Sequence, residues 1–122
     1  MRYQGKESDF QKTIARYLNL AGVLWAHCPN ETKGTKAHYF KRAAEGVKSG
    51  VPDILIFEPR GGRAGLAVEL KTKYNKPSVE QVQWLSELKR CGWEAFWSND
   101  IDEVLQRIDN YLSESETKKP IT

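Results

Sequence analysis

The 122-residue sequence contains no run of 18 apolar residues and only two cysteines. Without such a run we predict no transmembrane helix and no membrane partner. The N-terminus also lacks the apolar stretch of a secretory signal peptide. Cys28 and Cys91 lie far apart and form no CxxC pair, so a zinc site or a disulfide framework is poorly supported. We therefore expect a protein of the reducing cytoplasm.

Charge of neither sign dominates the chain. The formal net charge is +3 and the pI is near 8.9, which alone is weak support for a nucleic-acid partner. The distribution is more informative, because residues 33–48 hold five Lys or Arg against one acid, Glu45. We take six candidate DNA contacts from this segment: Lys33, Lys36, His38, Lys41, Arg42 and Lys48. The alternative interpretation is a solvated loop or helix face.

Hydrophobic periodicity predicts a succession of helices and strands without an internal repeat. We expect helices over residues 8–21, 79–90 and 100–112, a short helix around 37–45, and strands over 23–27, 51–58, 65–71 and 93–97. The order α-β-(α)-β-β-α-β-α predicts an α/β fold, with a mixed β-sheet flanked by helices. We expect one domain over residues 1–112 and a polar, flexible tail over 113–122. The four tryptophans are predicted core residues: Trp25, Trp84, Trp93 and Trp97.

Two charged groups interrupt the predicted strands of residues 51–58 and 65–71. Gly50-Val51-Pro52-Asp53 precedes an apolar run, and Glu69-Leu70-Lys71 follows another. Buried charge is costly unless it is paired or binds a metal. The turn signal at residues 59–63 predicts a hairpin, which would bring Asp53 and Glu69 to the same end of the sheet. Glu69 and Lys71, two residues apart on a strand, would then point to one face.

Carboxylates that converge in this way suit a hard divalent cation such as Mg²⁺ or Mn²⁺. The peptide carbonyl of Leu70 is a further candidate ligand, and Lys71 is placed to hold an attacking water or to neutralise charge on a phosphoryl group. Two simpler interpretations remain open. Asp53 could cap a turn, and Glu69 could pair with Lys71 on a solvated edge.

Five segments in order carry a resemblance to a known family: Glu7-Ser8-Asp9-Phe10-Gln11, His27-Cys28-Pro29-Asn30-Glu31, Gly50-Val51-Pro52-Asp53, Glu69-Leu70-Lys71, and Ser78-Val79-Glu80-Gln81-Val82-Gln83-Trp84-Leu85. Together the segments resemble the PD-(D/E)xK nuclease superfamily, and within it the VRR-NUC (virus-type replication-repair nuclease) domain in its stand-alone, phage-type form. The resemblance spans roughly residues 7–108, and the core motif shows no departure from the family pattern. It implies a restriction-endonuclease-like core.

The resemblance also implies roles for particular residues. Asp53 and Glu69 would be metal ligands, Lys71 the catalytic lysine, and Glu7 a further acid that completes the cluster directly or through water. Gln81 would orient the site or its substrate. The residues themselves also allow a macrodipole role for Glu7 and a capping role for Gln81 next to Ser78.

By the same resemblance, the chain would be a Mg²⁺- or Mn²⁺-dependent, structure-specific DNA endonuclease. The expected substrate is branched DNA such as Holliday junctions, and the expected assembly is a homodimer, since cutting two strands needs two active sites. A phage-encoded protein would work in the host cell cytoplasm. Two alternatives are a non-catalytic DNA-binding module on the same fold and a nicking or restriction-like endonuclease of the same superfamily.

Overall fold

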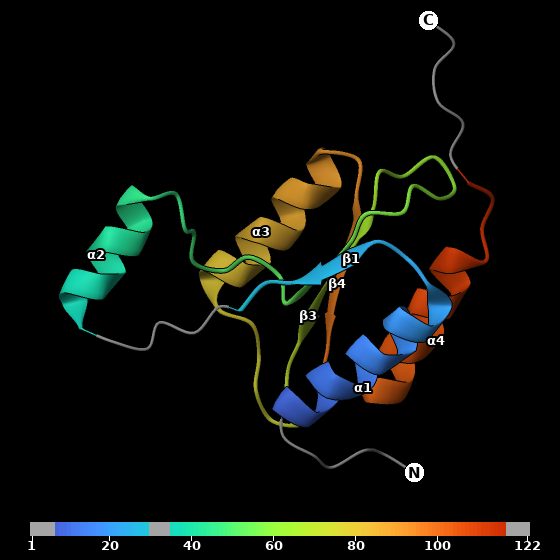
Figure 1. Cartoon of the computed structure of the whole chain (residues 1–122), viewed down its shortest axis with the longest axis horizontal. Helices are drawn as coiled ribbons and strands as arrows, with labels where there is room; N and C mark the ends of the chain where they lie inside the picture. The colour runs from blue at the N-terminus through green and yellow to red at the C-terminus, as the bar shows by residue number, and fades with distance from the viewer. Residues whose placement is uncertain (1–6, 30–34, 117–122) are drawn as a thin grey trace, which may run out of the picture.

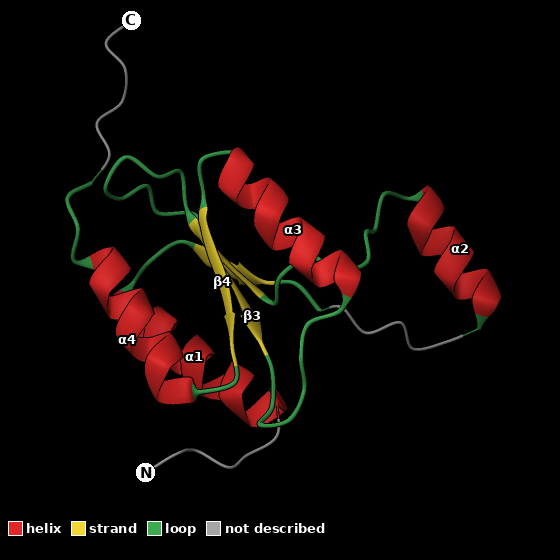
Figure 2. Cartoon of the chain, turned by 180° about the vertical axis from the view of Figure 1, so that it is seen from behind, coloured by secondary structure: helices red, strands yellow, loops and turns green. Residues whose placement is uncertain are grey.

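A mixed β-sheet lies at the centre of the molecule, with helices on both of its faces (Figures 1 and 2). The computed structural model describes residues 7–29 and 35–116. Its elements are α1 (Glu7–Ala21), β1 (Trp25–His27), α2 (Lys36–Ala44), β2 (Ile54–Ile56), β3 (Leu66–Leu70), α3 (Val79–Arg90), β4 (Glu94–Ser98) and α4 (Ile101–Leu112). This order confirms the predicted succession of helices and strands.

The strands lie in the order β1-β2-β3-β4. β1 and β2 are antiparallel, as are β2 and β3, whereas β3 and β4 are parallel and are joined through α3. Ile54 faces Val68 across the β2–β3 pair, so the residue before β2 comes next to the end of β3. The predicted hairpin is therefore confirmed.

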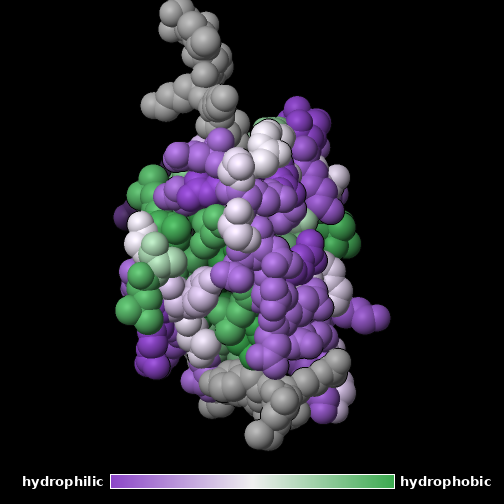
Figure 3. Space-filling view, turned by 90° about the vertical axis from the view of Figure 1, so that its right-hand side faces the viewer, coloured by the Kyte–Doolittle hydropathy of each residue, from purple (hydrophilic) through white to green (hydrophobic). Residues whose placement is uncertain are grey.

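The two faces of the sheet are covered unequally. α1 and α4 pack on one face over the larger core, which includes Phe10, Ile14, Leu18, Val68, Phe96, Val104 and Ile108. α3 covers the other face over a small cluster of Ala67, Leu85 and Ala95. Because side chains alternate along a strand, Glu69 lies on the α3 face together with Ala67. The outer side of the molecule, turned away from α2, is mostly hydrophilic (Figure 3).

One core prediction is wrong. Trp97 is 37% exposed, because alternation along β4 places it on the same face as Ala95, which α3 alone covers. Trp25 and Trp93 are partly buried against the two clusters. Trp84 is also partly buried, and its indole N–H donates to the Ser49 carbonyl at 3.0 Å.

α2 stands apart from the rest of the fold in both ribbon views (Figures 1 and 2). Every side chain of this helix that the structure describes is exposed. The helix starts at an N-cap, where the Thr35 hydroxyl accepts from the His38 N–H. Its position matches the short helix expected in the basic segment, although no core holds it.

The chain after α4 returns to the turn between β2 and β3. The Gly61 N–H donates to the Ser115 carbonyl at 2.9 Å, and Arg60 forms an isolated β-bridge with Glu116. The first residues of the expected tail are thus held against this turn, and residues 117–122 lie outside the described part. Among the helices that are described, no segment has the length and apolar character needed to cross a bilayer.

Candidate functional site

Asp53 and Glu69 come together at the end of the β2–β3 hairpin, on the side of the sheet that α3 covers. Asp53 is 6% exposed and Glu69 is 1% exposed. The Leu70 N–H donates to Asp53 Oδ2 at 2.8 Å, which ties the start of one strand to the end of the other. The two carboxylates therefore lie side by side in a site that is largely closed to water.

Lys71 and Gln81 both face Glu69. Lys71 Nζ lies 3.8 Å from Glu69 Oε1, and Gln81 Nε2 donates to the same oxygen at 3.0 Å. Gln81 also serves as the capping partner of α3, since its Oε1 accepts from the Ser78 N–H at 2.8 Å while its own N–H donates to the Ser78 hydroxyl. The capping interpretation of Gln81 is confirmed, and the same side chain also touches the acidic pair.

The loop that carries Asp53 lies against the first turn of α3. Gly50 has φ of +89°, and a Cβ atom there would approach the Glu80 backbone to 2.8 Å. Only glycine fits such a contact without displacing one of the two backbones. The Trp84–Ser49 hydrogen bond holds the same junction. Gly50 and Ser49 therefore set the distance between the Asp53 loop and the helix that bears Gln81.

Burial raises the pKa of Asp53 above its usual range. The Leu70 N–H, a hydrogen bond with Glu69, and the charges of His27 and Lys71 act in the opposite direction. Burial raises the pKa of the Cys28 thiol, and the negative charges of Asp53 and Glu69 raise it further. Cys28 lies at this site because its N–H donates to the Asp53 carbonyl at 2.8 Å, an oxygen that His27 Nδ1 also approaches to 2.9 Å.

The donors present fit a hard cation that keeps part of its water shell. Mg²⁺ is commonly bound through one or two carboxylates, with water in its remaining positions. Asp53 and Glu69 supply those carboxylates, and both are buried. The pKa values of Asp53 and of the neighbouring Cys28 thiol are raised there. A bound cation would offset the cost of burying this negative charge. Across residues 7–29 and 35–116 there is no group of three or more His, Cys, Asp and Glu able to hold a metal.

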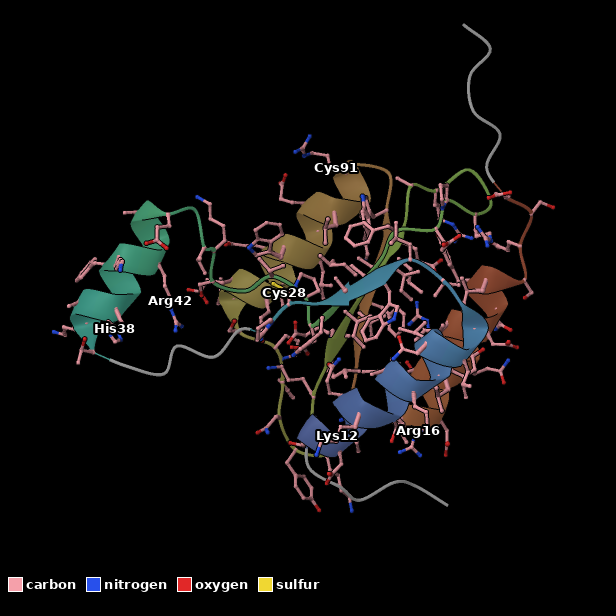
Figure 4. The ribbon with its side chains drawn as sticks, viewed as in Figure 1. Lys12, Arg16, Cys28, His38, Arg42 and Cys91 are labelled. Atoms are coloured by element: carbon pink, nitrogen blue, oxygen red, sulfur yellow. The ribbon has the colours of Figure 1, made fainter. Side chains whose placement is uncertain are left out.

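The structure describes two predicted parts of the site, Glu7 and the set of DNA contacts, only in part. Glu7 begins α1, as the spacing with Gln11, Ile14 and Leu18 suggested, but its side chain lies outside the described part. Lys33 also lies outside it. Among the other predicted DNA contacts, His38, Lys41 and Arg42 share one side of α2, next to Glu45, and Lys36 and Lys48 are exposed near its two ends. Figure 4 shows His38 and Arg42 on α2, away from the sheet.

One polar residue near the core, in the first segment of the family resemblance, is not among the predicted site residues. Gln11 lies on the face of α1 that carries the fully buried Ile14 and Leu18, and its Nε2 is buried without a hydrogen-bond partner among the described residues. A buried amide donor normally finds an acceptor. The helical spacing from Ile14 was the available signal, since it places a glutamine on a buried face.

Comparisons with known proteins agree on one family. A model of the VRR-NUC domain matches residues 2–99 of the chain. A solved structure named VRR_NUC domain protein is 25% identical, with a TM-score of 0.76 and 93% of each chain covered. A second, named VRR_NUC domain, is 22% identical with a TM-score of 0.59, covers 88% of this chain and 99% of its own, and supports the fold. No curated protein matches at a significant level.

Proposed function

Since the chain belongs to the VRR-NUC domain family, a family of nuclease domains, we propose that it is a DNA endonuclease that uses Mg²⁺ or Mn²⁺. The observation that carries the proposal is the buried pair of Asp53 and Glu69, with Lys71 and Gln81 both directed at Glu69. A purely structural ion pair would not need two adjacent buried carboxylates. The fit of this group to phosphodiester hydrolysis supports the enzyme over a binding module.

Asp53 and Glu69 would hold the cation, together with the Leu70 carbonyl and with Glu7 directly or through water. When bound, the cation would lower the pKa of a water and stabilise negative charge on a phosphoryl oxygen. Gln81 donates to Glu69 Oε1 and so fixes how this carboxylate is turned. The opposite side of the Gln81 amide is held by the helix cap, which makes the positioning rigid.

Lys71 would act on the reacting groups. Its ammonium lies 3.8 Å from Glu69, on the same side of the sheet as the pair, and its side chain is only 14% exposed. A cation there stabilises the charge that develops on the phosphoryl oxygens. The water oxygen bonds to phosphorus as the P–O ester bond breaks, and one water proton ends on the departing oxygen, which leaves one phosphate monoester and one hydroxyl.

We also propose branched DNA as the preferred substrate and a homodimer as the working form. The basic segment around α2 supports a nucleic-acid partner, because its exposed cations can contact phosphates. Two copies would present two active sites to a branched substrate, one for each strand to be cut.

The test is cleavage of labelled four-way junction, flap, nicked and linear duplex DNA with Mg²⁺ or Mn²⁺. We expect Lys71→Ala and Asp53→Asn each to lower the cleavage rate at least 100-fold, a typical loss when a group that stabilises transition-state charge is removed. Lys89→Ala, an exposed lysine on α3, is the matched control and should cleave at the wild-type rate.

Metal binding needs a readout that does not depend on cleavage. Mn²⁺ should raise the thermal midpoint of the wild type and of Lys71→Ala but not that of Asp53→Asn, because binding to the native state alone stabilises it. Wild type that binds DNA but cleaves none of the four substrates with either metal would overturn the enzyme proposal. Lys71→Ala that cleaves at the wild-type rate would overturn the site assignment.

A further inference from the structure

α2 is a short helix whose described side chains are not buried by the described part of the chain. Its nine residues, KAHYFKRAA, contain three Lys or Arg and no carboxylate, and all of its described side chains are exposed. A helix of this length is marginal in water without tertiary contacts. Burial against a further surface would therefore stabilise the helix beyond what the described residues of its own chain provide.

The helix has two different sides. His38, Lys41 and Arg42 lie together with Glu45 on the polar side. At 3.6 residues per turn, Phe40, Ala43 and Ala44 fall on the opposite side, with Lys36 one turn before Phe40. Phe40 is 65% exposed. An amphipathic helix with an exposed aromatic residue at its centre is the form that docks into a groove of a protein partner.

A hollow that could accept this side of α2 lies along α3, beside the loop that holds Ser49. Ser49, Glu80, Gln83, Trp84 and Glu87 line a volume of about 300 Å³. A cavity of roughly half that size admits a benzene ring, so a phenyl side chain fits. Two carboxylates and no cation line the hollow, although Glu87 also pairs with Arg90 at 2.7 Å. Its charge is therefore complementary to Lys36, the cation on the Phe40 side of α2.

We propose that the apolar side of α2 docks into the α3 hollow of a second copy of this chain, and that the two copies exchange α2 helices about a two-fold axis. Phe40 would enter the hollow beside Trp84, and Lys36 would approach Glu80. The exchange is isologous, since each chain gives one helix and receives the other. The polar side of α2, with His38, Lys41 and Arg42, stays open for DNA.

The connection after α2 argues against docking onto the same chain. Gly46 has φ of +96°, its N–H donates to Ala43, and the Val47 N–H donates to Arg42 at 2.9 Å. This pattern ends the helix and fixes the direction in which the chain leaves it. Ser49, only two residues after Val47, is already held by Trp84 at the edge of the hollow. In both ribbon views α2 lies apart from the α3 of its own chain (Figures 1 and 2).

The inference rests on the proposed homodimer but not on nuclease activity. Molar mass would be measured by light scattering at micromolar concentration in EDTA without DNA, so a failure of the nuclease proposal leaves this result readable. We expect the wild type to have the mass of two chains rather than 14.0 kDa. Phe40→Asp and Gln83→Arg should each weaken dimerisation at least tenfold, since the first puts a negative charge next to the carboxylates of the hollow and the second repels Lys36.

Mixing the two variants gives the sharper test. A heterodimer of the two variants contains one unaltered contact. In it, the unaltered α2 of the Gln83→Arg chain docks into the unaltered hollow of the Phe40→Asp chain. We expect the mixture to recover dimer that neither variant forms alone. A contact between two α2 helices would instead leave Gln83→Arg dimeric on its own, and a contact between two α3 helices would leave Phe40→Asp dimeric on its own.

Controls separate the interface from folding. Gln106→Arg and Leu20→Asp change exposed residues on α4 and α1 and should leave the dimer intact. Far-UV circular dichroism should show that Phe40→Asp and Gln83→Arg keep the wild-type fold, since both residues are exposed. A monomeric wild type, dimers that survive Phe40→Asp, or a mixture without recovery would each overturn the exchange.

Discussion

The carboxylate of Asp53 is buried in the folded chain, and this burial has a cost that depends on pH. Its pKa is raised by desolvation, although the Leu70 N–H, Glu69, His27 and Lys71 oppose the rise. A folded-state pKa above the unfolded value means that protonation favours the folded state. The stability that protonated Asp53 contributes to the folded state is therefore complete below the unfolded pKa, and it is lost as the pH rises through the folded pKa.

Asp53→Asn removes this titration. Without metal, we expect the variant to exceed the wild type in free energy of unfolding by roughly 1 kcal/mol at pH 8, because the amide keeps an acceptor for the Leu70 N–H and carries no buried charge. The difference should shrink as the pH falls toward the unfolded pKa of an aspartate. Urea unfolding in EDTA across this pH range measures it.

Asp102→Asn is the control for this experiment, since Asp102 is exposed in the first turn of α4. Its effect on the free energy of unfolding should be small, because the side chain is exposed. If Asp53→Asn is less stable than the wild type at pH 8, then the interactions of the Asp53 carboxylate outweigh the cost of its burial, and the net cost assigned to this carboxylate is wrong.

Gln81 shows how far residue-level prediction could go. The spacing of Ser78 and Gln81 predicted a capping box, and both of its hydrogen bonds are present. The contact between Gln81 Nε2 and Glu69 depends on how α3 lies across the sheet, which no local pattern encodes. The resemblance to a family could assign the residue a role, whereas the geometry of that role required the fold.

At the scale of elements, the junction between the Asp53 loop and α3 is the contact that assembles the site. Gly50 lies where a Cβ atom would meet the Glu80 backbone at 2.8 Å, and its φ is +89°. Gly92, at the end of α3, has a similar φ of +92° but nothing within 4 Å of an added Cβ. Substituting each glycine by alanine thus separates the free-energy cost of the positive φ, which both positions share, from the cost of the clash with α3, which only Gly50 has.

We expect Gly92→Ala to lose roughly 1 kcal/mol of unfolding free energy, the scale of a left-handed conformation for a residue with a Cβ. Gly50→Ala should lose at least twice as much, because it adds the clash with α3. Cleavage by folded Gly50→Ala should also fall, since the loop and Gln81 are pushed apart. Urea unfolding and the junction assay measure the two effects; equal losses in both variants would contradict the close contact.

The strand pattern could be predicted because alternation and turn signals are local. The turn at residues 59–63 predicted the β2–β3 hairpin with Asp53 and Glu69 at the same end of the sheet, and the pairing of Ile54 with Val68 confirms the hairpin. Trp97 was placed wrongly in the core for a non-local reason. Its exposure depends on how much of one sheet face α3 covers, which the strand sequence does not state.

For the whole molecule, the basic segment was the least predictable part. Its composition indicated cations and a short helix, and both are present. Composition does not say that α2 leaves the body of the fold, because that follows from the Gly46 turn and from the absence of a buried face among the described side chains of the helix. In the single chain α2 lies apart from the sheet that bears Asp53 and Glu69 (Figure 1), so we expect a DNA contact on this helix to position substrate.

That separation predicts a variant that loses salt-dependent binding while its acidic site stays intact. Each phosphate contact contributes about 0.9 to the slope of log K against log salt for duplex DNA, so Lys41→Ala/Arg42→Ala should reduce the slope by roughly 2. Binding would be measured in EDTA to prevent cleavage. Lys89→Ala/Arg90→Ala, a pair of exposed cations at the end of α3, should leave the slope unchanged.

The Lys41→Ala/Arg42→Ala variant also distinguishes the two roles proposed for α2, DNA binding and dimerisation. Lys41 and Arg42 lie on the side opposite Phe40, so the variant should keep the mass of two chains and the Mn²⁺ stabilisation of the wild type. Cleavage should fall at low DNA concentration and recover at saturating DNA, because weaker binding raises KM and leaves kcat unchanged. An unchanged salt slope, or a loss of kcat at saturation, would remove this side of α2 as the DNA contact and place the contact closer to the acidic pair.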